Sequence, residues 1–243
     1  MDNIRAVLFD LDGTIYYGSK LIPEADQVVK KYRQEGKKIF FMTNNSTKSR
    51  KQIWEKLTGM GLECSYDEVY TSGYAAALYA KQMGYHTVYI MGSKALEEEF
   101  GELDITVSDQ AEVVIVGYDM AFDYQKLTDA LQVAFHADKI IACNKERHYP
   151  GENAKRMPGC GAMVGALEGS LGREVDYSVG KPNPLLMEII CKDNDLRPEE
   201  VVVVGDTYES DIVMAQNYGS SAVYIGEEDH KDIKCIHAIG ELL

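Results

Sequence analysis

Residues 7–18 read VLFDLDGTIYYG, an apolar run that ends in two acidic residues, Asp10 and Asp12. A short, continuous apolar run is typical of a strand buried on both faces of a parallel sheet. If the backbone stays extended to Asp12, the two carboxylates lie on the same face, because strand side chains alternate. A buried strand that ends in two acids predicts a polar site at that end of the sheet.

Segments of the same kind alternate with helical patterns along the chain. Residues 23–36 place Pro23 at a helix start and Gly36 where the helix would stop, and a strand at 37–45 follows. We expect further helices at 46–57 and 72–84. Later, the strand VVVVGD at 201–206 lies between helical patterns at 182–194 and 209–219. This alternation predicts a parallel sheet covered by helices on both faces.

The middle of the chain, about residues 86–178, has strand and helix patterns of its own. We therefore predict an α/β protein of two domains, the second inserted into the first. The expected bounds are residues 1–80 and 179–243 for a Rossmann-like parallel-sheet core, and residues 81–178 for the smaller inserted α/β domain.

The composition excludes several classes of function. Of 243 residues, 45% are hydrophobic and 26% are charged, as in an ordinary globular protein. A formal net charge of −14 argues against broad nucleic-acid binding, whose affinity comes from Lys and Arg displacing counterions. Because signal-peptide features and a bilayer-length apolar run are both missing, we expect no membrane partner and a cytoplasmic location. Five scattered cysteines without a CxxC pair predict reduced thiols.

Polar residues follow three of the predicted core strands, at the point where each strand ends. They are Asp10, Asp12, Thr43, Asn44, Asp206 and Asp211. In an open parallel sheet, ligands bind beyond the carboxyl ends of the strands, so these side chains should converge. Several carboxylates so close together favour a bound cation, and an all-oxygen site suits Mg²⁺.

Three nearby features would suit a phosphoryl group beside that metal. Gly13 permits a tight turn after the first strand, and the N–H groups that follow it could cradle an anion. Lys181 adds a positive charge just before a predicted helix, and Thr43 offers a hydroxyl at a strand end. The core therefore carries the parts of a phosphate site.

Four strings in this order resemble the four motifs of the haloacid dehalogenase (HAD) superfamily of phosphatases. They are DLDGT at 10–14, TNNS at 43–46, GKPNP at 180–184 and GDTYESD at 205–211. The inserted domain after the second motif, and the string PGCGAMVGALEG from residue 158, are similar to the NagD-like subfamily. The resemblance implies the HAD fold, in which the inserted α/β domain is a cap.

The resemblance also assigns roles to the candidate residues. Asp10 would be the nucleophile that forms an aspartyl phosphate, and Asp12 would protonate the leaving group and then activate water. Mg²⁺ would be held by the Asp10 carboxylate, the Asp12 carbonyl and the Asp206 carboxylate. The phosphoryl oxygens would be bound by Thr43, Asn44 and Lys181. Asp211 would orient the metal ligands. The implied reaction is Mg²⁺-dependent hydrolysis of a small organic phosphate monoester.

The chain departs from the subfamily pattern in the cap. Residues 144–146 read NKE where many relatives have Asn-Pro-Asp, which leaves the substrate open. The side chains that follow could read a leaving group or could form a solvated loop; the candidates are Lys145, Glu146, Arg147 and His148. Similarly, Tyr16 and Tyr17 could line the entrance or serve in packing.

Other functions on this fold stay open at this point. A dehalogenase is disfavoured because it needs neither Asp12 nor Asp206. A phosphotransferase or phosphomutase would pass the group to a hydroxyl instead of water, and a non-catalytic phosphate-binding protein would keep the fold alone. A signalling receiver module is about half this length and has no cap. The resemblance further allows for a homodimer formed through the cap.

Overall fold

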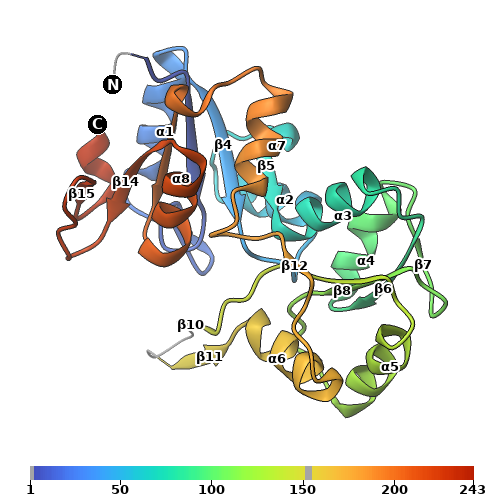
Figure 1. Cartoon of the computed structure of the whole chain (residues 1–243). Coiled ribbons are helices and arrows are strands. Elements are labelled where there is room, and N and C mark those ends of the chain that lie inside the picture. Colours follow the sequence, from blue (N-terminus) through green and yellow to red (C-terminus); the bar gives the residue numbers. More distant parts are fainter. Residues whose placement is uncertain (1–2, 151–154) are drawn as a thin grey trace. The chain divides into compact units, whose positions relative to one another are not determined.

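The computed structural model describes residues 3–150 and 155–243, which form two compact units. The first unit comprises residues 1–43, 51–70 and 181–243, and the second comprises residues 44–50 and 71–180. Each unit is built around its own parallel sheet with helices packed against it (Figure 1). The prediction of an α/β fold with a parallel-sheet core is confirmed.

The first sheet has six strands in the order β15-β14-β13-β1-β4-β5. Its strands are β1 (Ala6–Asp10), β4 (Lys38–Thr43), β5 (Val69–Thr71), β13 (Val201–Gly205), β14 (Ser221–Ile225) and β15 (Lys234–Ile236). Strand β1 pairs in parallel with both β4 and β13, so it lies in the middle of the sheet. All five β1 residues are buried, as the continuous apolar run predicted, and Phe9 stacks near Phe41 of β4.

Helices and short turns complete the first unit. The helices are α1 (Ala25–Gln34), α2 (Arg50–Gly59), α7 (Leu185–Asp193) and α8 (Val213–Tyr218), and a π-helical turn spans Tyr208–Ile212. A small hairpin joins β2 (Tyr16–Tyr17) and β3 (Lys20–Leu21), and short 3₁₀ turns span Tyr66–Glu68, Pro198–Glu200 and Ile239–Leu242. Helix α1 buries Ala25, Val28 and Val29, which lie at helical spacing on one face of the helix.

Helix α2 begins later than the predicted helix 46–57. The side chain of Asn45 is the cause, because its Oδ1 accepts the N–H groups of Thr47 at 2.9 Å and Lys48 at 3.2 Å. Such an Asx turn competes with helical hydrogen bonding and delays the first helical turn to Arg50.

The second unit has a five-stranded sheet in the order β12-β9-β8-β6-β7. Its strands are β6 (Thr87–Met91), β7 (Thr106–Val107), β8 (Val113–Val116), β9 (Lys139–Ala142) and β12 (Tyr177–Ser178). Its helices are α3 (Ser72–Gln82), α4 (Lys94–Gly101), α5 (Tyr124–Ala134) and α6 (Cys160–Leu171). Strands β10 (His148–Pro150) and β11 (Arg156–Pro158) pair in an antiparallel way.

The compact units divide the chain elsewhere than the predicted domains, which end at residues 80 and 178. Helix α3 and residues 44–50 belong to the second unit. Helix α3 packs on α4 through Gly73, where a Cβ would lie only 2.8 Å from the Leu96 side chain. The α3 residue Tyr79 also stacks on Tyr177 with ring centroids 4.7 Å apart. Tertiary packing places α3 and residues 44–50 in the second unit, and the local sequence pattern does not show this packing.

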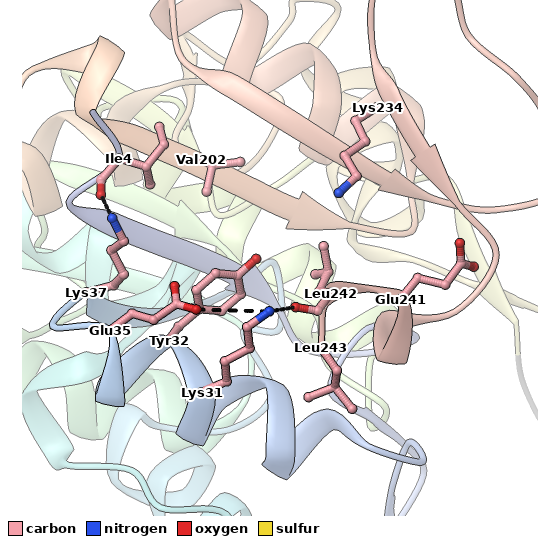
Figure 2. Close-up of a pocket in the computed structure, with 10 residues that line it drawn as sticks. All are labelled: Ile4, Lys31, Tyr32, Glu35, Lys37, Val202, Lys234, Glu241, Leu242 and Leu243. Atoms are coloured by element: carbon pink, nitrogen blue, oxygen red, sulfur yellow. Dashed lines mark hydrogen bonds and ion pairs between the residues drawn. The ribbon is translucent and has the colours of Figure 1, made fainter. Parts of the chain in front are cut away.

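A pocket of about 540 Å³ lies in the first unit, near the amino ends of several sheet strands (Figure 2). Its lining includes Ile4 and Lys37, which precede β1 and β4, and Lys234 at the start of β15. Lys31 donates to the Leu242 carbonyl at 2.7 Å, and Lys37 donates to the Ile4 carbonyl. None of the predicted site residues lines this pocket.

Within the described ranges, no helix combines the length and the apolar character needed to cross a membrane. The five cysteines are free thiols, as the sequence predicted, and Cys143, Cys160 and Cys191 are buried.

Candidate active site

Four charged side chains converge at the carboxyl end of the first sheet. Asp10 is the last residue of β1, Asp206 follows β13, and Asp211 lies in the π-helical turn after it. The ammonium of Lys181 lies between two of them, 2.5 Å from Asp10 Oδ1 and 2.6 Å from Asp211 Oδ1. Asp10, Lys181 and Asp211 are buried, so these ion pairs lie away from bulk water. The structure thus brings together Asp10, Asp206 and Asp211, which the strand-end argument grouped, and adds Lys181, which the sequence offered as a nearby positive charge.

Two glycines allow the chain to approach these carboxylates. A Cβ at Gly13 would lie 2.1 Å from Asp206 Oδ2, and Gly13 has a φ of +90° that other residues rarely adopt. A Cβ at Gly205 would lie 2.4 Å from Asp211 Cγ. The glycines of DLDGT and GDTYESD are therefore required by close contact with the acidic side chains.

Burial and mutual repulsion shift the ionisation of the carboxylates. Burial raises the pKa of Asp10 well above its ordinary value; Lys181 opposes this rise, and Asp211 and Asp206 add to it. Burial likewise raises the pKa of Asp206 to about 6, with Asp211 adding to the rise. Burial alone would lower the pKa of Lys181, but Asp10 and Asp211 outweigh it and hold this pKa above its ordinary value. Lys181 is therefore charged, and its single positive charge does not neutralise the three carboxylates Asp10, Asp206 and Asp211.

The donor set fits a divalent cation. Asp10, Asp206 and Asp211 each offer a carboxylate oxygen, and these oxygens lie within 4.8 Å of one another. Three carboxylates face one ammonium, and Asp206 Oδ1 is buried without a hydrogen-bond partner among the residues that the structure describes. Mg²⁺ prefers oxygen ligands, and a buried carboxylate oxygen without a hydrogen-bond donor is suited to bind it. Both carboxylate oxygens of Asp211 already accept bonds, Oδ1 from Lys181 and Oδ2 from the Thr207 N–H at 3.1 Å, whereas the bond of Asp10 to Lys181 uses Oδ1, so Asp10 and Asp206 are the better direct ligands.

Asp12 lies in a different environment from Asp10. Its side chain is exposed, and its Oδ2 accepts a hydrogen bond of 3.0 Å from the Tyr16 hydroxyl. Tyr16 is buried, and burial together with the charge of Asp12 raises its pKa, so the hydroxyl remains a donor. Lys56 Nζ lies over the Tyr16 ring, 3.4 Å from its centroid, in a cation–π contact. Two acids only two residues apart therefore lie in different surroundings, Asp10 buried beside Lys181 and Asp12 exposed beside the Tyr16 hydroxyl.

The expected anion cradle after Gly13 is not formed. The N–H groups of Thr14 and Ile15 both donate to the Leu11 carbonyl, at 3.3 and 2.9 Å, and the Gly13 N–H donates to the Tyr16 carbonyl at 2.9 Å. These bonds close a tight turn, and they use the donors that the prediction gave to a phosphate. That prediction was wrong because the sequence does not show which backbone donors a turn consumes.

Thr43 and Asn44 are neighbours in the chain but belong to different units. Thr43 is the buried last residue of β4 in the first unit. Asn44 belongs to the second unit, where its side-chain amide donates to Glu146 Oε1 at 2.8 Å. The structure therefore ties Asn44 to the loop that carries the predicted cap residues.

Comparison with known proteins identifies the family. Family models described as haloacid dehalogenase-like hydrolase and HAD-hydrolase-like match residues 7–106 and 178–238. The sugar-phosphatase AraL of Bacillus subtilis is 33% identical over 223 residues, which cover 90% of this chain and 82% of that protein. The chain belongs to the haloacid dehalogenase-like hydrolases. The predictions of this family and of a HAD-type phosphomonoesterase are confirmed.

Solved structures of HAD proteins agree over nearly the whole chain. One named as a nagD protein superposes with a TM-score of 0.91 at 26% identity and covers 97% of this chain and 96% of its own. A glycerol phosphate phosphatase from Mycobacterium tuberculosis, in complex with magnesium, has a TM-score of 0.84 at 28% identity and covers 94% of this chain and 70% of its own. The NagD-like arrangement is thus confirmed, and one HAD neighbour was solved with magnesium.

In this HAD protein, two of the four predicted cap residues have side-chain partners within the second unit, and the other two are exposed. Lys145 pairs with Glu168 at 2.9 Å, and Glu146 accepts the bond from Asn44. Arg147 and His148 are exposed, and His148 begins strand β10. Their role in reading a substrate stays a prediction.

Tyr16 and Lys56 are contacts of this HAD site that the sequence did not assign. The sequence indicates Tyr16 only as an entrance or packing residue, although it follows DLDGT and lies four residues after Asp12. Lys56 lies in helix α2, far along the chain, and only the fold places it over the Tyr16 ring.

Proposed function

We propose that the chain is a Mg²⁺-dependent phosphatase of small organic phosphate monoesters that works through an aspartyl phosphate on Asp10. The cluster of buried Asp10, Lys181 and Asp211 with the partly buried Asp206 carries this proposal. Asp10 and Asp206, with the Asp12 carbonyl, would hold the ion. Mg²⁺ when bound supplies positive charge that keeps the carboxylates ionised and offsets charge on the phosphoryl group.

In the first step, a carboxylate oxygen of Asp10 attacks phosphorus, and the bond from phosphorus to the leaving oxygen breaks. Asp12 donates its proton to that oxygen, so the alcohol departs neutral. The exposed position of Asp12, with the Tyr16 hydroxyl on its Oδ2, suits a group that must exchange protons. Lys181 and Thr43 bind the phosphoryl oxygens and hold phosphorus in line with Asp10.

In the second step, Asp12 takes a proton from water, and the water oxygen attacks phosphorus. The bond from phosphorus to the Asp10 oxygen breaks, which releases inorganic phosphate and returns Asp10 to its carboxylate form. Asp12 is again protonated, so both groups are ready for another turnover. Phosphoryl transfer of this kind depends mainly on positioning and on charge neutralisation, both of which the cluster can provide.

The names of two relatives support a substrate class. AraL is named a sugar-phosphatase, and the magnesium-bound neighbour is named a glycerol phosphate phosphatase. We therefore place phosphorylated sugars and polyols first among the substrates. A homodimer through the cap and a cytoplasmic location stay predictions.

Phosphate release from a panel of substrates tests the proposal. The panel contains sugar phosphates, glycerol phosphate, phosphoglycolate, nucleoside monophosphates, pyridoxal phosphate and p-nitrophenyl phosphate, each with Mg²⁺ or with EDTA. We expect turnover with Mg²⁺, loss of turnover with EDTA, and the highest kcat/KM on a sugar or polyol phosphate. A folded protein that releases no phosphate from any of them, or that releases it equally well in EDTA, would contradict the proposal.

A further inference from the structure

A network of hydrogen bonds in the second unit converges on one residue, Asn44. Its backbone carbonyl accepts two side-chain donors, Ser72 Oγ at 2.8 Å and Asn144 Nδ2 at 2.7 Å. Its side-chain amide donates to Glu146 Oε1 at 2.8 Å. Asn44, Ser72 and Asn144 are buried, so the two bonds to the Asn44 carbonyl are shielded from water. Glu146 is exposed, and its bond to Asn44 is partly buried. Glu146 lies about one hundred residues from Asn44 in the sequence, and nothing local explains their pairing.

The backbone of Glu146 is itself held in place. Its N–H donates to Asn144 Oδ1 at 3.0 Å, and its carbonyl accepts the Gly161 N–H at 2.7 Å. The start of helix α6 approaches this carbonyl so closely that a Cβ at Gly159 would lie 2.3 Å from it. The glycines of the string PGCG at 158–161 are therefore needed because a larger side chain there would prevent the start of α6 from packing against the Glu146 backbone. A carboxylate on such a fixed loop can fix its partner in turn.

Gly180 completes the network. A Cβ there would lie 2.5 Å from Asn44 Oδ1 and 2.4 Å from the Cys143 carbonyl, so the Asn44 side chain rests against the Gly180 backbone. Gly180 is the residue before Lys181, and Asn44 is the residue after Thr43. The segment that leads to Lys181 and the segment that follows Thr43 thus meet at the Asn44 side chain. Glu146 accepts the hydrogen bond from that side chain.

We propose that Glu146 is a positioning residue, which acts through Asn44 to fix the backbone next to Thr43 and Lys181. This inference rests on the proposed phosphatase function. Its Oε1 is committed to Asn44, so Glu146 acts on every substrate alike, whereas a residue that touches the leaving group would discriminate among substrates. Lys145 on the same loop pairs with Glu168 and has no part in the network.

A double-mutant cycle on activity tests the proposal. We expect Glu146→Ala and Asn44→Ala each to lower kcat about ten-fold, and the double variant to lose no more than about two-fold beyond either, because both remove one contact that positions the site. The loss should be the same for p-nitrophenyl phosphate and for a sugar phosphate. Glu146→Gln keeps an acceptor oxygen and should restore most of the activity. Lys145→Ala is the matched control, and its effect should multiply with that of Asn44→Ala.

Three outcomes would overturn the proposal. They are losses that multiply in the double variant, losses confined to one class of leaving group, and a Glu146→Gln variant as impaired as Glu146→Ala. Circular dichroism of each variant separates loss of function from loss of fold.

Hydrogen exchange supplies a readout that does not depend on activity. Peptides covering residues 43–50 should exchange about ten-fold faster in Glu146→Ala than in the wild type, while Lys145→Ala leaves them unchanged. Unchanged exchange in Glu146→Ala would overturn the network itself. An inactive wild type with this exchange pattern would refute the phosphatase function and leave the network standing, so the two failures are distinguishable.

Discussion

Glu99 on helix α4 is a buried carboxylate that opposes folding at neutral pH. Only 1% of its surface is exposed, and one oxygen accepts the backbone N–H of Arg50. The other oxygen, Oε2, has no hydrogen-bond partner in the described part of the chain. Burial raises the pKa of Glu99 from 4.5 to about 7; the Arg50 N–H and guanidinium oppose the rise, and Glu102 and Glu98 add to it. Replacing Glu99 by Gln removes the charge and keeps an acceptor for Arg50.

The size of the effect follows from the pKa. At about 1.4 kcal/mol per pKa unit, a rise from 4.5 to about 7 corresponds to a destabilisation of about 3 kcal/mol. Below pH 4.5 the group is protonated in both the folded and the unfolded chain, so the penalty is absent there. It grows as the pH rises to 7 and is constant above that. The Gln amide leaves an N–H group without a partner at a cost of about 1 kcal/mol, so the net gain at pH 8 is about 2 kcal/mol.

Urea unfolding of wild type and Glu99→Gln at pH 4.5, 6, 7 and 8 measures this difference. All other titrating groups are common to both proteins and cancel. We expect the free energy of unfolding of the variant, relative to wild type, to rise by about 3 kcal/mol between pH 4.5 and 8. Parallel stability curves, or a variant that loses stability relative to wild type as the pH rises, would refute the reasoning.

Three further substitutions follow from single contacts. Gly13→Ala forces a Cβ onto Asp206 at an unfavourable φ, and we expect kcat to fall about a hundred-fold in a steady-state assay that saturating Mg²⁺ does not rescue. Tyr16→Phe removes the hydroxyl from Asp12 and should lower kcat about ten-fold on sugar phosphates but much less on p-nitrophenyl phosphate; equal losses would count against an acid role for Asp12. Asn45→Ala removes the turn before α2 and should destabilise the fold by about 1 kcal/mol, seen as a lower Tm with unchanged van't Hoff cooperativity.

The convergence of the charged residues could be predicted because it follows from the order of a parallel sheet. Strands that run the same way end at one edge, so the residues after β1 and β13 had to meet. Asp10 and Asp206 were found by this argument alone. Lys181 was found from its positive charge just before a predicted helix, and in the structure it forms ion pairs with Asp10 and Asp211.

Other contacts of the site depend on packing between distant segments. The pairing of Asn44 with Glu146 joins residues about one hundred positions apart in the chain, and no periodicity encodes it. The turn at Gly13 does not offer its N–H groups to an anion, because they donate to backbone carbonyls within five residues. Local patterns thus predict which residues reach the edge of the sheet, while hydrogen-bond partners there are decided by the folded chain.

Trapping the phosphorylated enzyme tests the central claim, that Asp10 is the nucleophile. Wild type is mixed with p-nitrophenyl phosphate and Mg²⁺, quenched during turnover and reduced with borohydride, which converts an aspartyl phosphate to homoserine. Mass spectrometry of the peptide that contains Asp10 should then show homoserine at position 10, and Asp10→Asn should neither turn over nor be reduced. Rapid turnover without any modification at position 10, together with an active Asp10→Asn variant, would contradict the account.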